Sequence, residues 1–354
     1  MNYTENTKKL LIDHVRRYPN LKIRDIFKFL HQSALGCEHL VSSCERAVDY
    51  MKRESESLFG CGSTVVEPLD GNYSRVSLSV LSHGLSPEML GMLFFLSARE
   101  EKNGIEALNA KLSVAEELIL NGELPFPYEE FTAARDEWQS NGYPAIHHSE
   151  DFRSSYRPAY RVISNKFVQY LPLFTEIDKR RSDAAFTVAI DGGSASGKTT
   201  LAQILSQVYE CTVFHMDDFF LRPEQRTPER FAEIGGNVDR ERFLSEVLIP
   251  MKNGETVCYR KFDCEMFSLS QPTCVIPKPM TVIEGAYSMH FELSHYYDLT
   301  VFLDVSPDVQ RERIKKRNSE KMAERFFNEW IPLEHAYFEG MRVKERCDVC
   351  IGIR

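Results

Sequence analysis

One eight-residue segment constrains this chain more than any other feature of its sequence. Residues 192–199 read Gly-Gly-Ser-Ala-Ser-Gly-Lys-Thr, which fits the pattern GxxxxGK[ST]. An apolar, β-rich run at residues 186–190 precedes the segment, and a helical pattern at residues 199–209 follows it. A glycine-rich turn between a strand and a helix presents backbone N–H groups and the positive end of the helix, so this order predicts a phosphate-binding loop. A glycine-rich turn that fits the pattern by chance is the alternative.

The residue types of this loop predict how it would hold a nucleotide. We expect Lys198 to bridge the β- and γ-phosphates and the Thr199 hydroxyl to hold Mg²⁺, so ATP and Mg²⁺ are the expected cofactors. A loop of this kind does not by itself distinguish a kinase from an ATPase or a GTPase. The residues expected to contact the nucleotide are Gly192, Gly193, Ser194, Ala195, Ser196, Gly197, Lys198, Thr199 and Thr200.

After about residue 184, short apolar runs alternate with helical segments. This order predicts an α/β fold, in which a parallel sheet of the P-loop NTPase type carries flanking helices. The expected strands lie at residues 186–190, 211–215, 281–283, 299–304 and 348–353.

A pair of carboxylates follows the second of these runs, where the sequence reads His-Met-Asp217-Asp218. Open α/β sheets hold their ligands at the carboxyl ends of the strands, beside the phosphate-binding loop. A carboxylate there can accept the proton of a hydroxyl group held in line with a γ-phosphorus. The alternative is that these aspartates cap a helix.

The loop together with the segment Met-Asp-Asp-Phe-Phe at residues 216–220 resembles the uridine kinase family of P-loop kinases, which includes nicotinamide riboside kinase and is related to phosphoribulokinase. The resemblance covers residues 186–353, about half of the chain. It implies ATP-dependent phosphorylation of a hydroxyl group on a small molecule, with uridine or another nucleoside as the expected acceptor. It also implies that Asp217 is the catalytic base, and that Asp218 and Phe219 shape the entrance of the site.

The same resemblance extends to three further segments. Asp239, in Asn-Val-Asp, is similar to an aspartate that binds ribose hydroxyls, although a helix cap is the alternative. Tyr259 begins a stretch similar to one that lines the acceptor site, and Glu284 ends a strand at the position of an acid near Mg²⁺. Asp239 and Tyr259 are therefore expected substrate-binding residues, and Glu284 is an expected metal-site residue.

A basic helical segment after residue 307 resembles the lid of these kinases, whose arginines neutralise the transferred phosphate. Arg313 and Arg317 are four residues apart and share a helix face, so they are the expected catalytic arginines. Arg311 has a solvated helix surface as its alternative role.

Two departures from the family concern the acceptor. Relatives carry a histidine shortly after the Tyr-Asp-Phe stretch that helps to read the base, whereas residues 262–267 here read Phe-Asp-Cys-Glu-Met-Phe. Asn318 stands where relatives commonly have aspartate. A nucleotide-dependent switch that controls the N-terminal half is the alternative function.

Residues 1–178 are expected to form a mainly α-helical domain, and residues 184–354 the P-loop domain, with a charged boundary between them. The N-terminal half resembles no enzyme family that we recognise. Its polar clusters lie at residues 32–39, where Glu38 and His39 are expected late in a helix, and at residues 146–149. Residues 156–161, Tyr-Arg-Pro-Ala-Tyr-Arg, follow the second cluster. A small-ligand site, a metal site, packing and dimerisation are the alternatives for these segments.

Composition limits the partners of the chain. The net charge of −9 argues against a general nucleic-acid or membrane-surface binder, since both partners are anionic. The apolar stretch at residues 89–98 is too short to span a bilayer. Nine cysteines without a secretory signal predict reduced thiols and a cytoplasmic location. The expected partner is a small molecule, and a homodimer is one expected assembly.

Overall fold

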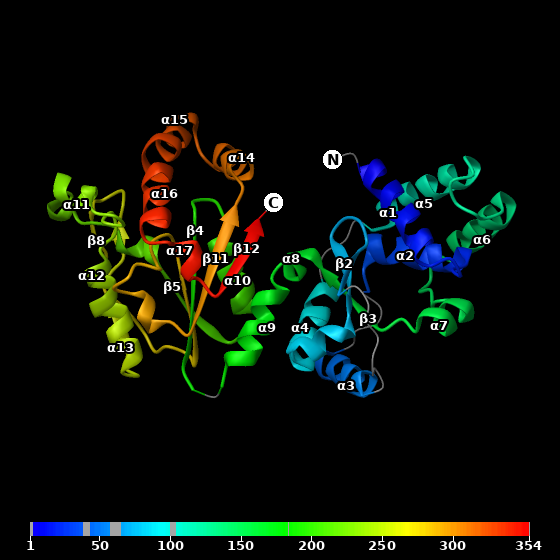
Figure 1. The fold of residues 1–354 in the computed structure, drawn as a ribbon, viewed down its shortest axis with the longest axis horizontal. Coiled ribbons are helices and arrows are strands. Elements are labelled where there is room, and N and C mark those ends of the chain that lie inside the picture. The colour runs from blue at the N-terminus through cyan, green and yellow to red at the C-terminus, as the bar shows by residue number, and fades with distance from the viewer. Residues whose placement is uncertain (1–2, 38–42, 57–64, 100–103, 183, 354) are drawn as a thin grey trace. The chain divides into compact units, whose positions relative to one another are not determined.

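The computed structural model describes residues 3–37, 43–56, 65–99, 104–182 and 184–353. The chain divides into two compact units, Met1–Asp178 and Lys179–Arg354 (Figure 1). The division falls within the last turn of helix α9, Leu171–Arg180. Glu38 and His39 lie outside the described residues.

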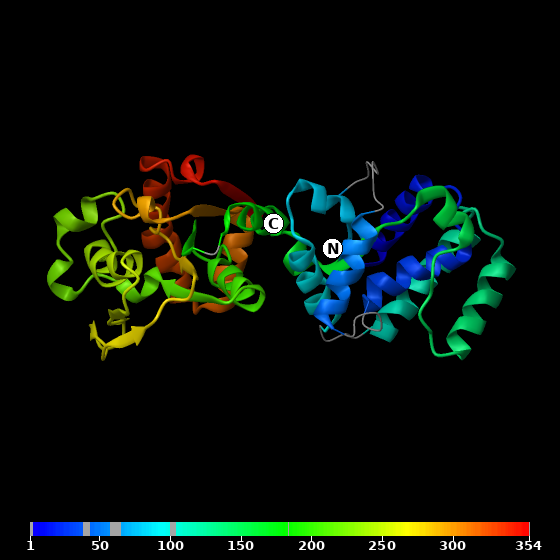
Figure 2. The same ribbon diagram turned by 90° about the horizontal axis from the view of Figure 1, so that it is seen from below.

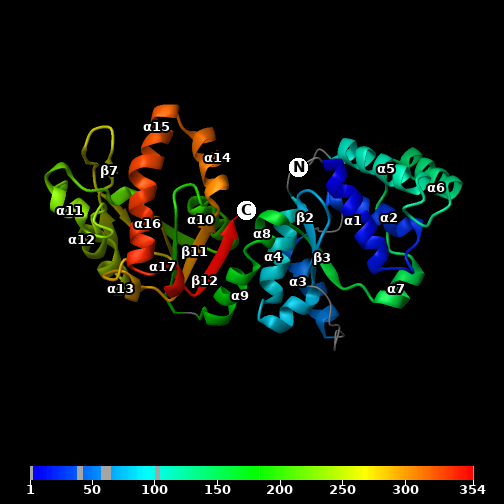
Figure 3. The same cartoon turned by 45° about the horizontal axis from the view of Figure 1, so that its top comes forward.

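The N-terminal unit is mainly helical, as expected. Helices α1, α2 and α5 lie side by side (Figures 1 and 3). Serine caps begin several of the other helices. At the start of α4, for example, the Ser86 side chain accepts a hydrogen bond from the Met89 N–H, and proline follows the cap. The helices are α1 Tyr3–Arg17, α2 Ile23–Leu35, α3 Cys44–Ser55, α4 Pro87–Ala98, α5 Gly104–Leu120, α6 Tyr128–Ser140, α7 Glu150–Tyr156, α8 Asn165–Val168 and α9.

This unit also contains an antiparallel sheet that sequence reasoning did not identify as a sheet. Its order is β1-β2-β3, formed by Val66–Pro68, Tyr73–Ser77 and Tyr160–Ser164. Strand β3 pairs with β2, which lies more than 80 residues earlier in the sequence, and Tyr160 lies opposite Ser77. The pairing partner is remote in sequence, so local periodicity gave no indication of it.

The C-terminal unit is built on a five-stranded parallel sheet with flanking helices, which confirms the predicted fold class. The strand order is β12-β11-β4-β10-β5, so the strand that leads into the glycine-rich loop lies at the centre. The five strands match the five predicted runs: β4 Phe186–Gly192, β5 Cys211–His215, β10 Met280–Glu284, β11 Leu299–Val305 and β12 Val349–Ile353.

Helices and two small hairpins complete this unit. Residues 220–275, green to yellow in Figures 1 and 2, lie together at one end of the unit. They contain α11 Pro228–Ala232, α12 Arg240–Phe243, α13 Ile249–Lys252 and the paired strands β6 Val257–Tyr259 with β9 Thr273–Val275 and β7 Phe262–Asp263 with β8 Ser268–Leu269. The remaining helices are α10 Lys198–Val208, α14 Pro307–Arg317, α15 Glu320–Arg325, α16 Ile331–Gly340 and α17 Val343–Arg346.

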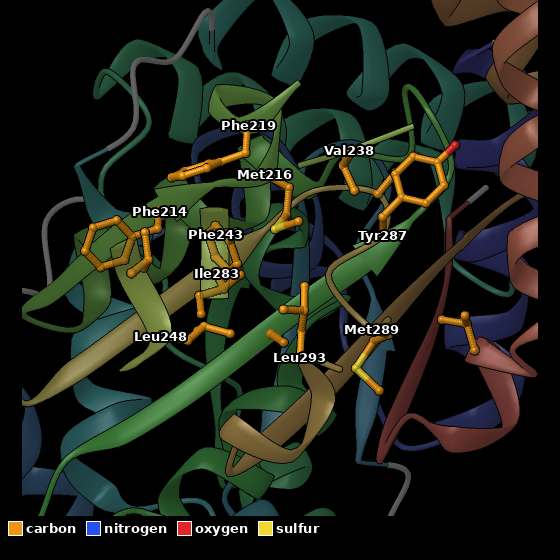
Figure 4. Close-up of a cluster of buried hydrophobic side chains, with 14 of the residues drawn as sticks. Phe214, Met216, Phe219, Val238, Phe243, Leu248, Ile283, Tyr287, Met289 and Leu293 are labelled. Carbon is orange, nitrogen blue, oxygen red and sulfur yellow. The ribbon is translucent and has the colours of Figure 1, made fainter. Parts of the chain in front are cut away.

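A cluster of buried apolar side chains joins the sheet to these outer segments (Figure 4). Phe214 from β5 and Ile283 from β10 are fully buried and belong to the same cluster as Phe243 of α12. Burial of large aromatic and aliphatic groups is the main favourable term in folding, so this cluster fixes the loops that follow β5 and β10. Those loops carry the candidate site residues.

One prediction about the cysteines is wrong. The structure joins Cys258 and Cys274 in a disulfide, whereas reduced thiols were expected throughout. The two residues lie directly opposite each other in the β6–β9 ladder. This antiparallel register brings them together, and sequence spacing alone did not reveal it.

No helix in the described ranges is long and apolar enough to cross a membrane.

Candidate active site

The glycine-rich loop connects β4 to α10 at the centre of the sheet. Gly192 has a φ of +146°, and a Cβ atom placed on it would lie 2.6 Å from the backbone oxygen of Leu303, so only glycine fits there. Gly197 has a φ of +103° and caps α10. Ala195 also adopts a positive φ of 59°, a conformation that is costly for residues with a Cβ and common at ligand-binding sites. Three residues of this loop therefore adopt positive φ angles, which sets the path of its backbone.

Lys198 lies against the loop that precedes it. Its ammonium group donates hydrogen bonds to the carbonyl oxygens of Gly192 at 2.8 Å and Gly193 at 3.0 Å. Thr199 and Thr200 follow in the first turn of α10 and are exposed. The lysine and the two hydroxyl groups thus meet at the amino end of this helix, where the helix dipole favours anions.

The carboxylate of Asp191, which directly precedes the loop, holds the loop by hydrogen bonds. It is fully buried, and it accepts hydrogen bonds from the N–H groups of Gly192 at 2.7 Å and Met289 at 2.9 Å and from the hydroxyl of Tyr337 at 2.7 Å. Burial raises the pKa of this carboxyl group, while the N–H and hydroxyl donors oppose the rise. Asp191 therefore links the loop to the segment after β10 and to α16.

Glu334 of α16 contacts the loop directly. Its side chain accepts a hydrogen bond from the Ser194 N–H at 2.9 Å and from the Ser194 hydroxyl at 2.5 Å. Burial raises the pKa of Glu334, and the charge of Lys198 partly offsets that rise. A buried acid therefore sits beside the lysine expected to bind phosphate.

A second acid comes from the neighbouring strand. Glu284 ends β10 and is buried, and its Oε1 atom lies 3.1 Å from the Thr199 hydroxyl and 2.6 Å from Nδ1 of His215. The hydrogen bond to Glu284 raises the pKa of His215. Residues 215 and 284 lie opposite each other in the β5–β10 register, so the sheet itself brings them together.

Asp217 follows β5 by two residues, and its side chain is open to solvent. Desolvation by the surrounding protein nevertheless raises its pKa, Lys198 lowers it, and the negative charge of Glu284 raises it further. A carboxylate with a raised pKa is a stronger base than an ordinary aspartate once it is ionised. The structure thus places the predicted base within the electrostatic influence of the predicted phosphate-binding lysine.

The other residues of this segment face different neighbours. The Asp218 carboxylate pairs with the Lys261 ammonium at 2.9 Å. Phe219 is fully buried, where its ring packs against Phe243 and stacks on Tyr259 with centroids 5.5 Å apart. Phe219 and Tyr259 therefore pack together in the core, whereas Phe219 was expected at the entrance of the site.

Asp239 occupies the helix-cap position that was its alternative role. It precedes α12, is buried, and accepts a hydrogen bond from the Arg242 N–H at 3.2 Å. Its second oxygen lies 3.6 Å from Nε of Arg222. Its own N–H donates to the Phe219 carbonyl oxygen at 2.8 Å, which ties the cap to the segment that carries Asp217.

The two expected lid arginines both lie on α14 but differ in their contacts. Arg313 donates to the carbonyl oxygens of Ala195 at 3.1 Å and Ser196 at 3.4 Å, so it lies on the glycine-rich loop. Arg317 is exposed at the end of α14, and it makes no contact with that loop among the described residues. The guanidinium of Arg311 lies over the ring of Phe327, at 4.7 Å from its centroid.

Sequence reasoning missed several residues of this site. His215 was part of the motif but received no role, and Asp191 directly precedes the loop, where an acid ending an apolar strand was a usable signal. Glu334 and Tyr337 lie over 130 residues beyond the loop they contact, and no local pattern marked them. Tyr287 is buried with a positive φ of 75°, and its hydroxyl points away from the other labelled side chains (Figure 4).

A central parallel strand, a glycine-rich loop and a helix in this order define a P-loop domain. Glu284 ends β10, which lies next to the central strand, and Asp217 follows β5, which lies next to β10. No known family model matches the chain. Among curated proteins, the chain is 30% identical over 178 residues to a bifunctional α-galactosidase/sucrose kinase of Mediterraneibacter gnavus, covering 44% of this chain and 19% of that protein. It is 27% identical over 139 residues to a uridine kinase of Chlamydia pneumoniae, covering 37% of this chain and 61% of that protein.

The match to the uridine kinase confirms the resemblance to that family over 139 residues, 37% of this chain. The chain spans about a fifth of the first relative and about three fifths of the second. Among solved structures, a possible uridine kinase from Bacillus stearothermophilus is 24% identical, with a TM-score of 0.42, covering 52% of this chain and 97% of that one.

Proposed function

We propose that the C-terminal unit transfers the γ-phosphoryl group of ATP to a hydroxyl group of a small molecule. The observation that carries the proposal is the position of Asp217 at the end of β5, close enough to Lys198 for the lysine to lower its pKa. A loop that only hydrolyses a nucleotide needs a positioned water molecule and has no need of a base for an alcohol. Asp217 supplies such a base.

In this proposal each residue has a separate task. Asp217 accepts the proton of the acceptor hydroxyl as its oxygen attacks phosphorus, while Lys198 and Arg313 lie where they can neutralise the transferred group. Backbone N–H groups of the loop orient the phosphates. Arg317 is assigned to the lid, at the end of α14.

The residues beside Lys198 also fit a magnesium ion. The hydroxyl of Thr199 and the carboxylate of Glu284 lie 3.1 Å apart, and both are oxygen ligands of the kind that Mg²⁺ prefers. Mg²⁺ supplies charge neutralisation of the phosphates when bound. Among the residues that the structure describes, no group of three or more His, Cys, Asp or Glu forms a protein-only metal cage, so phosphate oxygens and water would complete the coordination.

Uridine or another nucleoside is the proposed acceptor. The support for it is the similarity to the uridine kinase of Chlamydia pneumoniae. Asp239 and Tyr259 are the assigned substrate residues, with Asp218 and Phe219 beside the base.

A sugar hydroxyl is the second candidate acceptor. It is favoured by the 30% identity to the protein that includes a sucrose kinase. Residues 262–267 contain no histidine that would read a base, which also favours this candidate.

The test uses the full chain with Mg-ATP and two sets of acceptors, nucleosides and neutral sugars, with product masses read by mass spectrometry. A phosphorylated nucleoside supports the first acceptor and a phosphorylated sugar the second. A Lys198→Ala variant, assayed in parallel, should form neither product. Phosphate release from ATP with no phosphorylated acceptor in either set would reject the kinase and favour a nucleotide-dependent switch.

A further inference from the structure

The N-terminal unit contains a group of polar side chains that are buried or half-buried. We call it the Arg75 cluster. Its members come from α2, β2, β3 and the segment before α7, and they are Asp25, Lys28, Gln32, Arg75, His148 and Tyr160. Charged residues are rarely buried unless they are paired, so each of these contacts requires an explanation.

Arg75 is the centre of the cluster and is 2% exposed. Its Nε donates to Oε1 of Gln32 at 2.9 Å, its Nη1 lies 3.3 Å from Oε2 of Glu67, and its guanidinium lies over the Tyr160 ring at 4.7 Å from the centroid. Its Nη2 has no hydrogen-bond partner among the described residues. A buried donor on a permanent cation is costly to leave unpaired, and a ligand or water usually accounts for it.

The acids nearest to Arg75 are already engaged. Glu67 contacts Arg75, Nδ1 of His14 at 3.0 Å and Arg17 at 3.6 Å, and despite burial these contacts lower the pKa of Glu67 to about 2. The other ring nitrogen of His14 is a second buried polar atom with no partner among the described residues. Glu67 therefore stays ionised but has little capacity to accept further bonds.

Asp25 is similarly occupied. It accepts hydrogen bonds from the Lys22 N–H, from the N–H and hydroxyl of Ser149, and from Nδ1 of His148. Although burial acts to raise it, these donors lower the pKa of Asp25 to about 2. Asp25 therefore fixes the loop before α7 and has little capacity left to accept a hydrogen bond from Lys28.

Lys28 is a second cation, and no acidic side chain among the described residues is in direct contact with it. Its ammonium donates to the carbonyl oxygen of Ile146 at 2.9 Å. Burial, together with the positive charges of Arg75 and Arg153, lowers the pKa of Lys28 to about 8. The positive charges of Lys28 and Arg75 therefore influence each other, and the carboxylates of Asp25 and Glu67 already accept hydrogen bonds from other groups.

Neutral polar groups complete the cluster. Nε2 of His148 lies 2.6 Å from the Tyr160 hydroxyl, which in turn lies 3.3 Å from Oε1 of Gln32. Burial lowers the pKa of His148 to about 4, so the ring is neutral at physiological pH. These groups can orient the polar part of a ligand without adding charge.

We propose that the Arg75 cluster binds an oxyanion group, a carboxylate or a phosphate, of a small metabolite. Nη2 of Arg75 can donate to an oxygen of such a group, and Lys28 adds a second positive charge. A site of this kind is independent of the phosphoryl transfer proposed for the other unit. The competing explanation is an ordered water on Nη2 of Arg75, which would bind no anion.

The test follows the reaction of Lys28 with an amine-modifying reagent at about pH 8, with inorganic phosphate or succinate titrated into the millimolar range. The full chain carries Lys198→Ala, so that phosphate bound at the P-loop does not contribute. A bound anion should raise the pKa of Lys28, and a rise of one unit would reduce the unprotonated amine, and hence the labelling rate, about fivefold. Peptide mass spectrometry reports the rate for each lysine.

Lys111 is the matched control. Burial also lowers its pKa, but its ammonium already lies 3.3 Å from Asp70. Its labelling rate should not change with either anion, and matched chloride corrects for ionic strength. Protection of Lys28 by phosphate alone assigns a phosphate ester, protection by succinate alone assigns a carboxylate, and protection by both assigns any oxyanion.

Arg75→Lys separates the role of the guanidinium from that of charge alone. The variant keeps the positive charge but loses the Nη2 donor, so the protection of Lys28 should fall severalfold. An unchanged Lys111 rate shows that the unit remains folded. Absence of protection by either anion in the parent chain, or equal protection in Arg75→Lys, would overturn the proposal.

Discussion

Replacement of Asp217 by asparagine tests the proposed chemistry most directly. The side chain is open to solvent and makes no hydrogen bond to other described residues, so the isosteric change should leave the fold intact. It removes the only proton acceptor that we assign to the reaction. Lys198, which is held by two loop carbonyl oxygens, remains in place to bind ATP.

The magnitude follows from the role of the base. General-base assistance contributes about 10²- to 10⁴-fold to rate, which corresponds to about 3–5 kcal/mol of transition-state stabilisation. We expect kcat to fall by that factor. Since Asp217 and Lys198 attract each other, the neutral variant should bind ATP equally well or slightly more tightly.

The assay measures initial rates of phosphorylated product, with ATP affinity determined separately by calorimetry. Asp218→Asn is the matched control, because Asp218 is adjacent but pairs with Lys261, and its rate should change much less. The raised pKa of Asp217 also predicts that kcat/KM of the parent falls on acidification at a pH above the ordinary aspartate value of about 4. A Asp217→Asn rate within a few-fold of the parent would refute the assignment of the base.

Three further changes have expected outcomes of their own. Gly192→Ala places a Cβ atom 2.6 Å from a backbone oxygen of β11, so calorimetry should show ATP binding lost at least tenfold. Tyr337→Phe removes the hydroxyl that donates to the buried Asp191, and it should lower the free energy of unfolding, measured with urea, by about 1–3 kcal/mol. Asp25 has a folded pKa of about 2, below its unfolded value, so its contribution is present above about pH 4 and is lost as the pH falls toward 2. Hydrogen exchange in α2 should therefore show a loss of about 2 kcal/mol across that range, and a smaller loss in Asp25→Asn would confirm the source.

The part of the site that lies close together in sequence was predictable. Gly192 and Gly197 need positive φ angles that glycine adopts freely, and Lys198 and Thr199 follow the second of them at fixed spacing. The residues of the loop themselves determine its backbone conformation, so the sequence of the loop predicts it. The five strands of the parallel sheet were predictable for a similar reason, since strands buried on both faces read as short apolar runs.

The contacts that cross the fold were not predictable from one sequence. Glu334 reaches Ser194 only because α16 packs beside the loop, and its sequence context is that of an ordinary helix. Likewise, β3 carries Tyr160 to the Arg75 cluster through pairing with a strand more than 80 residues earlier. Patterns in sequence report which face of an element is apolar, but they do not report which remote element will cover it.

The same distinction explains why the loop was assigned a ligand and the N-terminal unit was not. In the loop, the donors are backbone N–H groups, and a single motif fixes their geometry. In the Arg75 cluster, the donors are side chains from α2 and β2, and only the folded chain shows that Asp25 and Glu67 are saturated while Nη2 of Arg75 has no partner among the described residues. A buried donor without a partner is a property of the folded structure, so a residue such as Arg75 is identified by counting donors and acceptors among the described residues.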